Sequence, residues 1–168
     1  MLSCCGGCSD RARFGQPSSK ERRRIESMLQ LTLPAGTDFK LRKHISGMDP
    51  VQLLVFDVPR SQAETLLTRP PLAGNLKDGD RSARPIPPAL DPRVTTEEML
   101  RRRLDTDHRP IMNTTRLKGQ AATVWNPDGA IRFKFGLYET TAANSAVVHV
   151  FVDLDDKETA RFYIVCMQ

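Results

Sequence analysis

Residues 121–164 carry the clearest pattern of this chain, and they read AATVWNPDGAIRFKFGLYETTAANSAVVHVFVDLDDKETARFYI. Within them, Asn126-Pro127-Asp128-Gly129 separates two apolar runs, residues 121–125 and residues 130–138. Proline presets the backbone at the first central position of a turn, and glycine tolerates the positive φ that follows. The pattern therefore predicts a β-hairpin whose second strand alternates apolar and polar side chains.

Two more alternating runs follow this hairpin. Apolar residues recur at every second position of residues 148–154, and they do so again in residues 160–164. An acidic turn at residues 155–158 joins the two runs. Four sequential strands with short connections predict an antiparallel meander with one buried face, which helices must cover.

The first half of the chain predicts two helices and two strands. Residues 19–30 and 61–67 each have helical apolar spacing. A Ser-x-x-Glu capping box stands at each start, at residues 18–21 and 61–64. Residues 39–45 alternate as a strand does. Residues 51–58 are nearly all apolar, so we expect that strand to lie centrally in its sheet.

A proline-rich segment interrupts this regular pattern. Residues 69–94 hold six of the twelve prolines and predict a long loop or linker, which is either a binding segment or a variable surface insertion. Residues 95–105 predict a third capped helix.

The sequence as a whole predicts one α+β domain over residues 18–168, with the Pro-rich excursion at residues 69–94. We expect an antiparallel sheet with a C-terminal four-stranded meander, packed by about three short helices on one side. Residues 1–17 contain several glycines and serines without apolar periodicity, and they predict a flexible tether.

Three of the four cysteines, Cys4, Cys5 and Cys8, lie in this tether, and Cys166 lies near the other end. A structural zinc site needs four ligands at paired spacing, so we predict no metal site, and we predict no cofactor. A thiol beside small residues on a flexible terminus is accessible to an acylating enzyme. We therefore predict lipidation at Cys4, Cys5 and Cys8, with an incidental tail as the alternative.

Two routes of lipidation fit the N-terminal residues. The residues before Cys4 resemble the end of a bacterial lipoprotein signal, whose apolar stretch would have to lie upstream of Met1. Alternatively the cysteines are palmitoylated, and basic residues supply the second signal that stable anchoring needs. Residues 1–43 hold nine Lys or Arg against four Asp or Glu. This excess suits an anionic membrane, although a solvated helix face explains it as well.

A search for catalytic chemistry finds no glycine-rich nucleotide loop, serine-hydrolase elbow or zinc-protease motif in the chain. No catalytic residue is predicted, although His149 could form an acid–base set with Asp57 or Glu139. The aromatic residues of the last strands lie at core positions in an acidic region, which argues against nucleic acid as a partner. The candidate partner surface comprises Arg101, Arg102, Arg103 and His149.

Four short motifs of this chain resemble small uncharacterised lipoproteins of GC-rich bacteria. They are Leu33-Pro34-Ala35-Gly36, Gly47-Met48-Asp49, Phe56-Asp57-Val58-Pro59 and the helix at residues 61–67. The resemblance covers about a third of the chain and transfers no catalytic residue. It implies an envelope protein of unknown molecular role.

These features predict a lipid-tethered, non-enzymatic protein of the cell envelope, which lies at a membrane surface and contacts a protein partner. Two alternatives stay open. One is a soluble cytoplasmic enzyme of an unfamiliar family that uses His149 or the acidic turn. The other is an immunity-type inhibitor that neutralises a partner protein.

Overall fold

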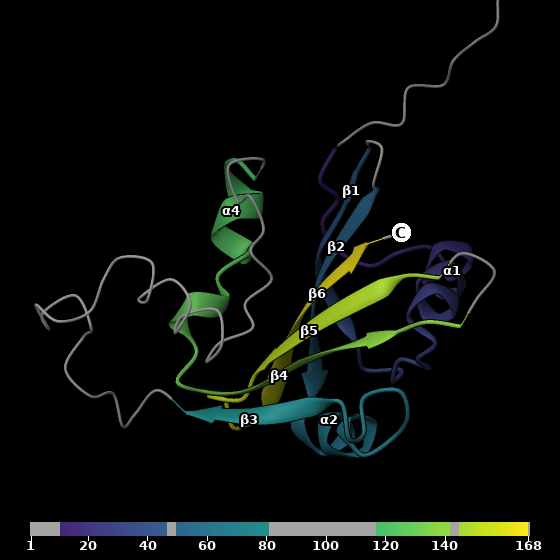
Figure 1. Cartoon of the computed structure of the whole chain (residues 1–168). Coiled ribbons are helices and arrows are strands. Elements are labelled where there is room, and N and C mark those ends of the chain that lie inside the picture. The colour runs from purple at the N-terminus through teal and green to yellow at the C-terminus, as the bar shows by residue number, and fades with distance from the viewer. Residues whose placement is uncertain (1–10, 47–49, 81–116, 142–144, 168) are drawn as a thin grey trace, which may run out of the picture.

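The computed structural model describes residues 11–46, 50–80, 117–141 and 145–167, drawn as ribbon in Figure 1. Six antiparallel strands form one sheet in the order β1-β2-β6-β5-β4-β3. The strands are β1 (Asp38–Ile45), β2 (Val51–Pro59), β3 (Leu76–Asp80), β4 (Arg132–Glu139), β5 (Val147–Asp153) and β6 (Thr159–Met167). The helices in the described ranges are α1 (Ser19–Leu29), α2 (Arg60–Leu67) and α4 (Gln120–Val124), with a single 3-10 turn at Pro127–Gly129. The α+β class is therefore confirmed.

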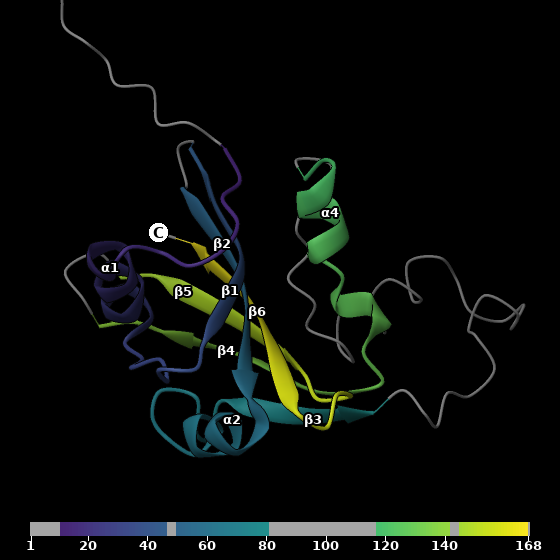
Figure 2. The same ribbon diagram turned by 180° about the vertical axis from the view of Figure 1, so that it is seen from behind.

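Helices lie on both faces of the sheet, with α1 and α4 on opposite sides (Figure 2). One buried apolar layer lies beneath α1 and α2, and a second lies beneath α4. The expectation that helices pack on one side only is corrected here. The reason is that the inner strands have apolar side chains on both faces of the sheet, so both faces must be covered. In β2, for example, four consecutive residues are buried: Leu53, Leu54, Val55 and Phe56.

The segment expected as the first strand of the meander is a helix, which is a second correction. Ala121 lies in the helix and Leu117 and Trp125 flank it, and all three side chains are buried in the second layer. Gly119, with φ +57°, begins the turn into α4. The meander therefore contains three strands, β4, β5 and β6, and the neighbour of β4 at the sheet edge is β3.

β3 lies within the segment that the prolines mark as a loop. After α2, residues 69–75 turn back, and Leu76–Asp80 pairs with β4. The helix expected at residues 95–105 and the turn Gly47-Met48-Asp49 lie outside the described residues. No helix among those that are described has the length and apolar character to cross a bilayer.

Two of the predicted capping boxes lie in the described residues, and their outcomes differ. At α1 the Ser18 hydroxyl accepts a hydrogen bond from the Glu21 amide at 3.2 Å, as expected. The box predicted at Ser61 is wrong, because α2 begins at Arg60 and its N-cap is Pro59. The Arg60 amide donates instead to the Glu158 carbonyl at 2.8 Å, so a tertiary contact takes the place of the cap.

We expect Gly136→Ala to displace β3 from the sheet. A Cβ at Gly136 would lie 2.0 Å from the Asn75 carbonyl oxygen, and this backbone can only move as a unit. The expected loss is about 1–3 kcal/mol of unfolding free energy, with faster hydrogen exchange at Leu76–Asp80. Gly129→Ala is the matched control, since its nearest contact would be 3.5 Å away. Equal denaturation midpoints for the two variants would contradict the prediction.

Candidate functional site

Most of the predicted site residues lie outside the described part of the chain. These are the proposed lipid carriers Cys4, Cys5 and Cys8 and three residues of the candidate partner surface, Arg101, Arg102 and Arg103. His149 alone of the predicted set is described.

His149 lies half-buried in β5, between Leu137 of β4 and Val165 of β6. Asp57 lies opposite Arg161, four residues from Val165, which separates it from His149 by ~13 Å along the strands. The fold therefore does not bring His149 and Asp57 together. Glu139 is closer, since its register partner Val147 is two residues from His149.

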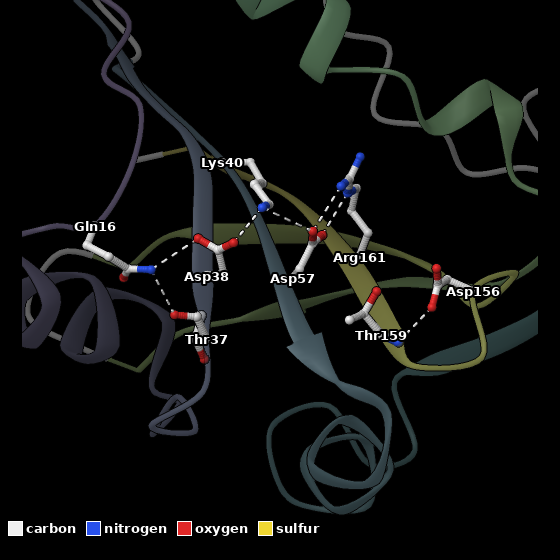
Figure 3. A network of polar contacts seen from close by, with 8 residues as sticks. All are labelled: Gln16, Thr37, Asp38, Lys40, Asp57, Asp156, Thr159 and Arg161. Atoms are coloured by element: carbon white, nitrogen blue, oxygen red, sulfur yellow. Dashed lines mark hydrogen bonds and ion pairs between the residues drawn. The ribbon is translucent and has the colours of Figure 1, made fainter.

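A row of ionisable side chains crosses β1, β2 and β6 on the same face as α4, and Figure 3 shows it. We call Asp38, Lys40, Asp57 and Arg161 the charged row. Alternate residues of a strand point to the same face, so Asp57 lies on the face of Leu53 and Val55, which belong to the second apolar layer. Lys40 reaches the row because β1 has a register irregularity between Phe39 and Leu41, and a bulge of this kind re-aims a side chain.

The centre of the charged row is a two-pronged ion pair. Arg161 Nε donates to one Asp57 oxygen at 2.7 Å, and Arg161 Nη2 donates to the other at 2.9 Å. Lys40 Nζ lies 3.7 Å from Asp57 and also contacts Asp38. Two parallel hydrogen bonds of this kind fix the orientation of both groups, so Arg161 and Asp57 form an ordered polar pair beside the second apolar layer.

The two cations of the row, Lys40 and Arg161, are held in their protonated state. The hydrogen bonds from Arg161 to Asp57 raise the pKa of the guanidinium, and the hydrogen bond to Asp38 is the largest cause that raises the pKa of Lys40. Cations that keep their protons near neutral pH do not serve as general acids or bases. Lys40 and Arg161 are therefore suited to bind an acceptor group rather than to transfer a proton.

The N-terminal arm, residues 11–17, is fastened to the edge of the sheet beside this row. Arg13 and Arg42 exchange two backbone hydrogen bonds, at 2.8 and 2.9 Å. Gln16 Nε2 donates to the Thr37 carbonyl at 3.3 Å and to Asp38 at 3.1 Å (Figure 3). This part of the segment expected as a tether thus runs along β1.

A second group of charges ties the arm, β1 and α1 together. Arg42 is only 6% exposed, and its guanidinium contacts the Glu21 carboxylate. Arg13 lies 3.7 Å from the same carboxylate. Glu21 is therefore the shared partner of an arm residue and a buried strand residue.

In the acidic turn between β5 and β6, the carboxylates accept hydrogen bonds from backbone amides. Asp155 accepts from the amides of Ile131 and Arg132 at 2.6 and 2.7 Å. Asp156 accepts from the amides of Glu158 and Thr159, and the bond from Thr159 is the largest cause that lowers the pKa of Asp156. In the described ranges, no group of three or more His, Cys, Asp or Glu side chains could hold a metal ion.

His149 lines neither of two cavities that open on the described surface. The larger, of about 330 Å³, is lined by Arg60, Asp78, Gly79, Arg132, Phe133 and Leu154. Its charged side chains are engaged, since Arg60 donates to the Leu154 carbonyl at 3.0 Å and Asp78 pairs with Lys134. The smaller, of about 280 Å³, lies between α2 and the chain that enters β1.

Cys166 is fully buried in the first apolar layer, and burial raises the pKa of its thiol to about 11. In a variant with Cys4, Cys5 and Cys8 replaced by serine, this is the sole thiol. We expect the folded variant to react with a maleimide at least about a thousandfold more slowly than the same variant in denaturant, because reaction requires opening of the core. Similar rates in both states would show that Cys166 is accessible.

The sequence analysis did not predict the charged row, although two of its residues have unusual positions in the sequence. Asp57 stands as one acidic residue at the end of an apolar run, and Arg161 stands alone between apolar residues of the last strand. A charged residue inside such a run indicates a partner on the neighbouring strand. The pairing partner itself depends on strand order, which the sequence pattern does not contain.

Comparison of the chain with protein-family models, with curated proteins and with solved structures finds no match in any of the three.

Proposed function

We propose that this chain is a lipid-tethered, non-enzymatic interaction module of the cell envelope, with the lipid on Cys4, Cys5 or Cys8. The observation that carries the proposal is the fastening of the arm to β1 through the Arg13–Arg42 hydrogen bonds. Cys8 precedes Arg13 by five residues, a distance of at most ~18 Å of extended chain. A lipid there would hold the folded domain directly at the membrane surface.

The partner-binding half of the proposal is supported by the end of the sheet that lies away from the charged row. Leu137 and Met167 are 42% and 37% exposed, and Val147 and His149 lie half-buried beside them. Strand alternation puts these four side chains on the same face as Phe151 and Tyr163. Exposed apolar side chains beside a histidine suit contact with another protein.

Intact-mass measurement of the protein purified from its native host tests the tether. We expect a mass increase by one or more acyl groups and recovery in the membrane fraction. The matched control carries serine at positions 4, 5 and 8 and should be unmodified. An unmodified wild-type polypeptide recovered wholly in the soluble fraction would overturn the proposal.

A further inference from the structure

The outward face of α1 is uniformly basic. Helical spacing places Lys20, Arg23 and Arg24 opposite the buried Ile25 and Leu29. All three cations are exposed, and none of them forms an ion pair within the described ranges. The only other residue at the centre of this face is Ser27.

The acidic residues of α1 lie on its flanks and are used inside the fold. Glu21 contacts Arg13 and Arg42. Glu26 binds Arg22 at 3.3 Å and accepts from the Leu33 amide at 3.1 Å. No carboxylate of α1 is therefore left to neutralise its outward face.

Arg22 does not belong to this exposed group, although it is adjacent in the sequence. Its Nη2 donates to the carbonyls of Leu33 and Pro34 at 2.8 and 2.7 Å. These bonds close the connection between α1 and β1. The structure thus separates one structural arginine from the three outward cations.

The outward cations do not stabilise the helix that carries them. Lys20 lies three residues before Arg23 and four before Arg24, and like charges at these spacings destabilise a helix. Folding therefore does not account for this arrangement. An anionic surface outside the molecule would bind all three cations at once.

The arm continues the same basic character to the edge of the sheet. The Arg13 side chain is 66% exposed, and the next residue, Phe14, is 40% exposed. An aromatic ring beside cations is typical of segments that lie at a lipid headgroup layer. The Arg13–Glu21 contact holds the arm against the first turn of α1, so the two basic elements adjoin.

We propose that Arg13, Phe14, Lys20, Arg23 and Arg24 form the membrane-facing surface of the domain, and that its ligand is an anionic phospholipid leaflet. This inference rests on the proposed tether, because Cys8 lies five residues before Arg13 and would bring the same surface to the bilayer. In this orientation α1 and the β1 edge face the membrane. β3, at the opposite edge of the sheet, faces away from it.

Vesicle binding by the full chain with serine at positions 4, 5 and 8 tests this surface without any lipid on the protein. The vesicles are phosphatidylcholine alone or phosphatidylcholine mixed with phosphatidylglycerol. We expect binding only to the anionic vesicles, weakened by salt. The triple variant Lys20→Gln, Arg23→Gln, Arg24→Gln should bind about a hundredfold more weakly, since each surface cation contributes about 1 kcal/mol.

The matched control is the triple variant Arg69→Gln, Lys77→Gln, Lys157→Gln, which loses the same charge from exposed positions on other elements. It should keep most of the binding, and both triple variants should keep the denaturation midpoint of the parent. Equal losses in the two triple variants would overturn the proposal, because net charge would then explain the binding. Tighter binding to a short nucleic-acid duplex than to the anionic vesicles would also overturn it.

The orientation has its own readout. An environment-sensitive dye on Phe14→Cys should change its emission when anionic vesicles are added, whereas the same dye on Lys77→Cys in β3 should not. A response at both positions would contradict the orientation. Because the protein here carries no acyl group, these results stand apart from the intact-mass result that decides the tether.

Discussion

Glu21→Ala is expected to lower the free energy of unfolding by about 3 kcal/mol, measured from denaturant midpoints. The cause is Arg42, whose guanidinium is 6% exposed and contacts the Glu21 carboxylate. Removing one member of a buried pair leaves the other charge in the interior, here with a long hydrogen bond of 3.5 Å from Arg42 Nη2 to the Gln16 carbonyl, at a cost of about 3–5 kcal/mol. We take the lower end because the Glu21 side chain itself is 29% exposed. The loss should also release the arm, since Arg13 shares this carboxylate.

Glu64→Ala is the matched control for this prediction. Glu64 also pairs with an arginine, Arg60 at 3.4 Å, but its side chain is 68% exposed. An exposed pair one helical turn apart contributes only about 0.3–0.5 kcal/mol, so this variant should be close to wild type. Adding Arg42→Met to Glu21→Ala should restore most of the stability, because no charge then stays buried. Similar small losses for Glu21→Ala and Glu64→Ala would show that Arg42 is solvated.

Trp125→Ala is expected to cost about 3–5 kcal/mol and to loosen the whole cover of the second sheet face. The indole is 7% exposed and meets the Tyr163 ring edge-on, with centroids 5.6 Å apart. Tyr163 also donates from its hydroxyl to the Asn126 carbonyl at 3.1 Å. Both contacts hold α4 and the turn after it on the sheet. Hydrogen exchange should therefore accelerate at residues 120–126 more than in α1.

Trp125→Phe is the control that keeps an apolar ring in this place. We expect it to lose less than half of what the alanine variant loses, with exchange in α1 unchanged. If the alanine variant instead accelerated exchange equally in α1 and α4, the two layers would unfold as one unit. The separate role given to Trp125 would then be wrong.

The elements that the sequence predicted correctly are those defined by a local period. The alternation of β4, β5 and β6 and the spacing of α1 are present in short windows, and the strands and helix lie where these windows are. The apolar run of residues 51–58 also indicated an interior strand, and β2 does lie between β1 and β6.

The charged row could be predicted only in part. Asp57 and Arg161 are visible as charges within apolar runs, but their pairing follows from the β2–β6 register. Lys40 joins them because the register of β1 shifts between Phe39 and Leu41, and no residue type in β1 predicts this shift. Strand order and bulges arise from contacts between distant segments, so a single-sequence pattern cannot place these side chains together.

Composition and local spacing were sufficient to establish the α+β class, the capped α1 and three strands of the meander, because each depends on residues within about ten positions of one another. Tertiary contacts decided that Gln120–Val124 is helical and that both sheet faces are covered. They also decided that β3 completes the sheet. A short apolar segment can form either a helix or a strand. Which of the two it forms depends on the surface that it packs against, which here is the layer around Tyr163 and Phe151.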